Sequence, residues 1–88
     1  MNEMSLVKAI LNDRIWGLTV PLEDHTGTLI LNLDNIYVII QSLPITGQYS
    51  LGYIDDDGNL RFSHFSCLAD LIDMAEVYLR DRTCISWN

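Results

Sequence analysis

The amino-acid sequence predicts an α+β domain in which an antiparallel meander of four to five strands packs an N-terminal helix and a C-terminal helix on one face. Three patterns indicate this class. Apolar residues recur every three or four positions near both ends, apolar and polar residues alternate in between, and segments rich in Gly, Asp and Asn separate the alternating runs. With 88 residues, 49% of them hydrophobic, residues 1–88 are expected to form a single domain with one core.

The first helix is predicted over residues 4–11, where apolar positions follow helical spacing and polar positions fall on the other side. Asn12 and Asp13 then favour the end of the helix, because their side chains compete for backbone hydrogen bonds. The apolar stripe of this helix consists of Met4, Val7, Ile10 and Leu11.

A first hairpin is predicted next. Residues 16–22 alternate as in a half-buried strand, and Pro21 marks its end or an edge position. The polar segment 23–27 favours a turn, after which the alternation resumes. The large side chains expected on one side are Trp16, Leu18, Val20 and Leu22 on the first strand and Leu29, Leu31 and Leu33 on the second.

Three further strands are predicted after a tight turn at residues 34–35. Residues 36–40 are apolar on both faces, which favours a central strand. A loop over residues 42–47 leads to a second hairpin, whose strands 49–54 and 60–65 flank the turn Asp55-Asp56-Asp57-Gly58-Asn59.

The last helix is predicted to begin after Ser66, which occupies the position expected of an N-cap. It is expected to end through residues 80–82, where Arg80 and Arg82 suit a helix C-terminus. The tail 83–88 is expected to add a short edge strand or to dock. The predicted core consists of Val7, Ile10, Leu18, Val20, Leu29, Leu31, Val38, Ile40, Leu68, Leu71, Ile72, Ala75 and Leu79.

The charge balance is strongly acidic, because twelve Asp and Glu face five Lys and Arg and give a formal net charge of -7. Five scattered cations do not form the basic face that a nucleic-acid-binding protein needs. An anionic membrane surface likewise repels a chain with a net negative charge. We therefore expect no direct nucleic-acid binding and no membrane binding, but a basic surface of another protein as partner. The N-terminus does not resemble a leader, so the host cytoplasm is expected, with Cys67 and Cys84 as reduced thiols. The chain is expected to be a monomer or a homodimer.

Two segments resemble functional motifs but are interpreted as ordinary loops or turns. The segment Leu43-Pro44-Ile45-Thr46-Gly47 matches a sortase signal, but it precedes two strands and a helix and is interpreted as a loop. The turn 55–59 resembles a calcium loop, yet aligning Gly58 places Tyr53 and His64 at the outer ligand positions. A solvated hairpin tip is therefore predicted, and no metal.

No catalytic residues and no cofactor are predicted. Ser63 and His64 face opposite sides of a strand, and Ser66 is explained as a cap. Cys67 then follows as an ordinary residue of the first helical turn, and His25 lies in a separate turn. A domain of this size rarely encloses the pocket that an enzyme needs, so a binding role is favoured over an enzyme.

Acidic residues of the second hairpin tip and the last helix are predicted to bind the partner. Three of them crowd one turn, and three share a stripe opposite the apolar face of the helix. Like charges held this close repel one another, which a cationic partner would relieve. A solvated face alone also accounts for the stripe, and Glu76 is placed to pair with Arg80 at i,i+4. The predicted contact residues are Asp55, Asp56, Asp57, Asp70, Asp73 and Glu76.

In size, charge and helix-strand-helix order, the chain resembles the small acidic inhibitors encoded by phages and mobile elements, including anti-CRISPR proteins. This resemblance implies an inhibitor that docks on a basic nucleic-acid-binding groove of a nuclease or CRISPR-type complex and blocks it stoichiometrically, with carboxylates in place of phosphates. The alternatives are an immunity protein or antitoxin for a basic toxin, which uses the same electrostatics, and a structural or assembly subunit with an apolar interface.

Overall fold

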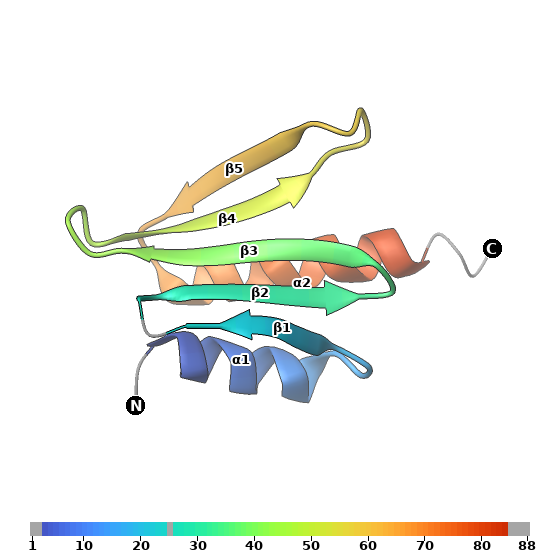
Figure 1. The fold of residues 1–88 in the computed structure, drawn as a ribbon, viewed down its shortest axis with the longest axis horizontal. Coiled ribbons are helices and arrows are strands. Elements are labelled where there is room, and N and C mark those ends of the chain that lie inside the picture. Colours follow the sequence, from blue (N-terminus) through green and yellow to red (C-terminus); the bar gives the residue numbers. More distant parts are fainter. Residues whose placement is uncertain (1–2, 25, 85–88) are drawn as a thin grey trace.

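The computed structural model describes residues 3–24 and 26–84, with side chains described as far as residue 82. It confirms the α+β class (Figure 1). In chain order the elements are α1 (Glu3–Arg14), β1 (Thr19–Glu23), β2 (Thr28–Leu33), β3 (Ile36–Leu43), β4 (Gln48–Ile54), β5 (Leu60–Phe65) and α2 (Leu68–Cys84).

The five strands form one antiparallel sheet in the order β1-β2-β3-β4-β5, so each strand pairs with its neighbours in the chain. β3 is central, as its two apolar faces predict. In the register, Leu29 lies opposite Ile40 and Leu31 opposite Val38, and Ile40 in turn lies opposite Leu51. These side chains share one side of the sheet, which is the inner face.

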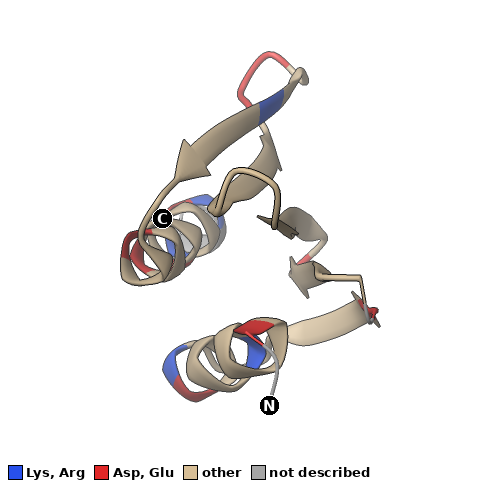
Figure 2. Cartoon of the chain, turned by 90° about the vertical axis from the view of Figure 1, so that its left-hand side faces the viewer, with Lys and Arg blue, Asp and Glu red and all other residues tan. Residues whose placement is uncertain are grey.

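Both helices cover this inner face (Figures 1 and 2). α1 contacts β1 and β2, whereas α2 lies across β3, β4 and β5, and the two helices also contact each other. The opposite side of the sheet carries neither helix and is called the open face.

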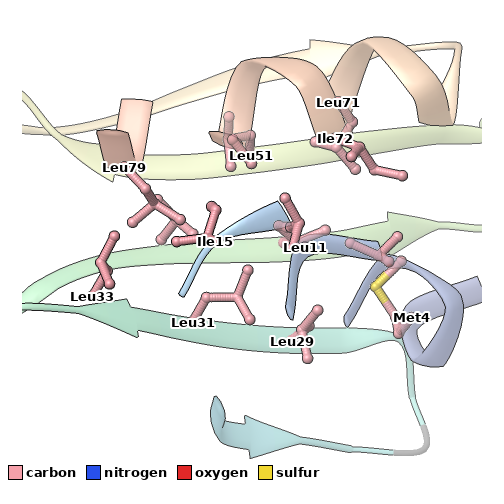
Figure 3. Packing of buried hydrophobic residues seen from close by; sticks show 14 residues of the cluster. Met4, Leu11, Ile15, Leu29, Leu31, Leu33, Leu51, Leu71, Ile72 and Leu79 are labelled. Atoms are coloured by element: carbon pink, nitrogen blue, oxygen red, sulfur yellow. The ribbon is translucent and has the colours of Figure 1, made fainter. Parts of the chain in front are cut away.

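The hydrophobic core lies between the helices and the inner face (Figure 3). Most of the predicted core residues are buried, and Ile10, Leu18, Val20 and Leu68 are partly buried against them. The core also contains buried residues that the predicted set does not include: Met4, Leu11, Ile15, Leu33 and Leu51.

The helix ends differ from the prediction. α1 continues through Asn12 and Asp13, because both side chains are exposed and leave the buried stripe of the helix uninterrupted. At the start of α2, the backbone N–H of Leu71 donates to the carbonyl oxygen of Cys67 at 3.3 Å. Cys67 therefore takes the N-cap position in place of Ser66, and it precedes the first helical turn.

The first strand is shorter than predicted and its faces are different. β1 begins at Thr19, and Trp16, which is 96% exposed, lies outside it. A register shift between Thr19 and Leu22 turns Leu22 to the open face, opposite Ile30 of β2. Leu22 therefore does not share a side with Leu18, which packs against the core.

Two segments predicted as irregular belong to regular elements. β3 extends through Ser42 and Leu43, which pair with β4, so the connecting loop begins only at residue 44. α2 continues through residues 83 and 84. The rest of the predicted tail, residues 85–88, lies outside the described residues.

Candidate protein-binding site

The tip of the β4–β5 hairpin is organised by the carboxylate of Asp55. Its Oδ1 accepts hydrogen bonds from the backbone N–H groups of Asp57 at 3.0 Å and Asn59 at 2.9 Å, and its Oδ2 accepts one from Nε of Arg61 at 2.7 Å. The hydrogen bond from Arg61, followed by that from Asn59, lowers the pKa of Asp55 below its ordinary value. Both oxygens of this carboxylate are therefore engaged within the fold.

The turn between β1 and β2 repeats this geometry. Oδ1 of Asp24 accepts hydrogen bonds from the backbone N–H groups of Thr26 and Thr28, both at 3.0 Å, and the bond from Thr28 is the main cause that lowers the pKa of Asp24. Each turn has a glycine three residues after its Asp, Gly27 with φ of 97° and Gly58 with φ of 82°. The pattern that resembles a calcium loop is thus turn chemistry, and the segment is confirmed as a hairpin tip.

The other tip carboxylates differ in their surroundings. Asp56 pairs with Arg82 of the last turns of α2, whereas Asp57 is exposed. The guanidinium of Arg82 also lies over the ring of Tyr78, 5.1 Å from its centroid. The Tyr78 hydroxyl in turn donates to the carbonyl oxygen of Ile54. These contacts connect the hairpin to the C-terminal part of α2.

Two of the three predicted carboxylates on α2 are ion-paired. Nη1 of Arg14 lies 2.9 Å from Oδ1 of Asp73 and 3.1 Å from Oε1 of Glu76, and these bonds, that to Asp73 first, raise the pKa of Arg14. Nε of Arg80 lies 2.9 Å from Oε2 of Glu76, which confirms the i,i+4 pair. Among the described residues, Asp70 is exposed and has no cation within ion-pair distance.

The structure does not bring the two predicted groups of carboxylates together. The hairpin tip reaches α2 through Arg82, whereas Asp70 lies in the first turn of the helix. Between these two residues the helix rises by about 18 Å, at about 1.5 Å per residue. The predicted contact residues therefore form two separate acidic regions.

A groove between α2 and β5 adjoins one of these regions. It consists of two hollows of about 370 Å³ and 310 Å³ that share the side chains of Phe65, Met74 and Val77. Met74 and Val77 are 47% and 50% exposed, so apolar surface remains open on a helix that otherwise buries its apolar stripe. We call this feature the α2–β5 groove.

Carboxylates border the α2–β5 groove along α2. Asp70 and Asp73 line the first hollow and Asp81 lines the second. Helical geometry explains this grouping, because residues three, four and seven apart lie on the same side of a helix. Met74, Val77 and Asp81 are not among the residues predicted from the sequence to bind a partner. The sequence does contain a signal for this surface, because the apolar residues Met74 and Val77 have helical spacing and lie beside the predicted acids Asp70 and Asp73.

The remaining residues considered for chemistry stay apart. Ser63 is on the inner face and His64 on the open face, as strand alternation predicts. Cys67 is free and exposed, whereas His25 and the side chain of Cys84 lie outside the described part of the chain. Among the described side chains, which end at residue 82, no group of three His, Cys, Asp or Glu could hold a metal ion.

Comparison with family models, with curated protein sequences and with solved structures finds no significant match to this chain. Neither of the two described helices is both long and apolar enough to cross a bilayer.

Proposed function

We propose that this chain is a non-enzymatic binding domain that inhibits a basic target protein, and that it docks through the α2–β5 groove. The observation that carries the proposal is the combination of an apolar floor with an acidic border. Phe65, Met74 and Val77 form the floor, and Asp70 and Asp73 stand beside it. The apolar side chains of a basic amphipathic surface would fill the hollows, and its Lys and Arg side chains would reach the carboxylates.

The charges of the chain support a cationic target. Its five Lys and Arg residues all pair with acids of the same chain, through the ion pairs of Lys8, Arg14, Arg61, Arg80 and Arg82. The net charge of -7 is therefore carried by the remaining carboxylates. Such a surface attracts a basic protein groove and is repelled by nucleic acid.

The target class that fits these charges is the nucleic-acid-binding groove of a nuclease or CRISPR-type complex in a cytoplasm. Carboxylates along the α2–β5 groove would then occupy positions that phosphates take when nucleic acid is bound. An immunity protein or antitoxin would use the same contacts on a toxin nuclease. Asp55, Asp56, Asp73 and Glu76 form ion pairs within the fold, so we expect each of them to contribute less to binding than Asp70. Exposed Asp57 is expected to be a secondary contact.

A matched pair of charge reversals tests the electrostatic part. Asp70→Lys changes the border of the groove, and Asp13→Lys makes the same change in net charge at an exposed position of α1 outside the groove lining. The probe is a fluorescent amphipathic peptide with Leu on one side and Lys and Arg on the other, titrated by anisotropy at low and physiological salt. We expect Asp70→Lys to weaken binding several-fold more than Asp13→Lys, mainly at low salt. Equal effects of the two variants would show that only net charge matters and would overturn the proposed site.

A second matched pair tests the apolar part. Val77 and Phe62 are both 50% exposed, but Val77 lies in the groove and Phe62 on the open face. Val77→Ser is expected to raise the dissociation rate of the peptide, because it removes apolar contact from the floor. Phe62→Ser should leave that rate unchanged. Loss of binding in both variants, or in neither, would contradict docking in the α2–β5 groove.

A further inference from the structure

A row of apolar residues crosses the open face from one edge of the sheet to the other. The register places Leu22 opposite Ile30, Ile30 opposite Ile39, Ile39 opposite Gly52, and Gly52 opposite Phe62. The row therefore has one member on each of the five strands. Leu22 is 41% exposed and Phe62 is 50% exposed, so both ends of the row are open to solvent.

The open face carries no Asp, Glu, Lys or Arg side chain within the five strands. Among their residues only Glu23 and Arg61 have such charges, and both register on the inner side, opposite Leu29 and Tyr53. On one side of the row the polar residues are Thr28, Gln41, Ser50 and His64. On the other side they are Thr19 and Asn32. The exposed apolar residues around the row are Tyr37, Ile54 and Leu60.

We infer that the open face binds a second copy of this chain, and that the protein forms a symmetric dimer by stacking two open faces. A two-fold interface presents the same patch to itself, so a face without charge meets no like charge in its copy. The acids lie on the helices, in the loops and at strand ends (Figure 2), so a chain with a net charge of -7 can associate through this face with its carboxylates turned outward. A cationic partner, by contrast, finds no carboxylate there.

The size of the open face is sufficient for a reversible dimer. Five strands about 4.8 Å apart, each of about six residues rising about 3.3 Å, cover roughly 500 Å² in projection, and the relief of the side chains adds to this area. Two such faces would bury roughly 1,000 Å² in total before this relief is counted, which lies below the roughly 1,600 Å² of a standard interface and within the range of weak, reversible ones. Stacked sheets lie about 10 Å apart, a distance that the side chains of the apolar row can fill.

This dimer would leave the α2–β5 groove free, because the groove is lined by α2 and by the inner-face residues Ser63 and Phe65. The two interactions also respond to salt in opposite directions. Salt screens the repulsion between two acidic copies and strengthens the dimer, whereas it weakens attraction to a basic target. The inference is thus independent of the proposed function, and either can fail without the other.

The test is sedimentation equilibrium of the purified chain over a wide range of protein concentrations, at low and moderate salt. We expect the average mass to rise toward that of two chains with increasing concentration, and at lower concentration when salt is added. Phe62→Lys places a cation in the apolar row and should keep the chain monomeric. The matched variant Val77→Lys, at an equally exposed residue on the opposite side, should dimerise like the unchanged chain.

Leu60→Lys, at a residue 51% exposed near the row, gives a second variant should Phe62→Lys unfold, as judged by circular dichroism. It is expected to weaken the dimer at least tenfold. The inference is overturned if the unchanged chain stays monomeric at every concentration, or if Val77→Lys disrupts the dimer as strongly as the open-face variants. Dimerisation that resists every open-face substitution would likewise assign the interface to another surface.

Discussion

The aromatic ring of Phe62 lies over Gly52 on the open face of the sheet. The two residues are paired across β4 and β5, and a Cβ atom added at position 52 would come within 2.7 Å of Cε1 of Phe62. The absence of a side chain at Gly52 therefore gives the ring its place in the apolar row. Glycine normally weakens the interior of a strand, so its presence here has a packing reason.

A double-mutant cycle tests this relationship. Gly52→Ala alone should bring no stability gain, because the new methyl group displaces the ring of Phe62. In a Phe62→Ala background the same change should stabilise the fold by about 0.5 to 1 kcal/mol, since alanine loses less backbone entropy than glycine on folding. Denaturant melts of the four proteins measure the coupling. Equal effects of Gly52→Ala in both backgrounds would show that the ring does not depend on the glycine.

Burial on the inner side of α2 predicts the largest stability effects. Leu71 is fully buried, whereas Met74, one turn along the same helix, is 47% exposed. Leu71→Ala should lower the free energy of unfolding by about 2 to 5 kcal/mol, because it leaves a cavity in the core. Met74→Ala should cost less than about 1 kcal/mol. Chemical denaturation checks both values, and a cost well under about 1 kcal/mol for Leu71→Ala would contradict the assigned core.

Stability should fall in acid partly through Asp55. Its pKa is lower in the folded chain than in the unfolded chain, so its contribution is present above the unfolded pKa and is lost as the pH falls through the folded pKa. Asp55→Asn removes this contribution. The stability difference between the unchanged chain and the variant should therefore shrink from about pH 6 to about pH 2.

A second substitution separates the ion pair from the turn. Arg61→Gln removes the cation but leaves the backbone hydrogen bonds to Asp55, so it should abolish only part of the acid dependence. Thermal melts over this pH range give the comparison. A stability difference for Asp55→Asn that does not change with pH would contradict the role assigned to this carboxylate.

Removal of metal ions should leave the fold unchanged. Both carboxylate oxygens of Asp55 already accept hydrogen bonds from the protein, and the matching turn at Asp24 uses the same chemistry. We expect the same melting temperature with and without EDTA. A drop of several degrees on chelation would mean that the hairpin tip holds a cation.

Strand alternation and helical spacing were sufficient to predict the order of elements, the central position of β3 and most of the core. They failed where a local feature changes the spacing. The register shift in β1 turns Leu22 to the open face, which alternation alone cannot predict. The exposed positions of Asn12 and Asp13 permit the helix to continue, although both residue types favour helix ends.

The candidate site was predicted only in part, because pairing and grooves depend on elements that are far apart in the chain. Arg14 reaches Asp73 from a different helix, and Asp56 meets Arg82 across the fold. The sequence indicates how many carboxylates the chain has, but not which of them are already paired. The α2–β5 groove likewise requires the placement of β5 beside Met74.

The most direct test of the binding role is a capture experiment from an extract of the source cell. The three immobilised baits are the unchanged chain, the Asp70→Lys variant and the Asp13→Lys variant, and mass spectrometry identifies the proteins that each bait captures. We expect the unchanged chain and Asp13→Lys to capture a basic nucleic-acid-binding protein that Asp70→Lys does not capture. This protein should release its nucleic acid when the unchanged chain is added. Capture of the same proteins by all three baits, or captured proteins that keep their nucleic acid, would contradict the proposal.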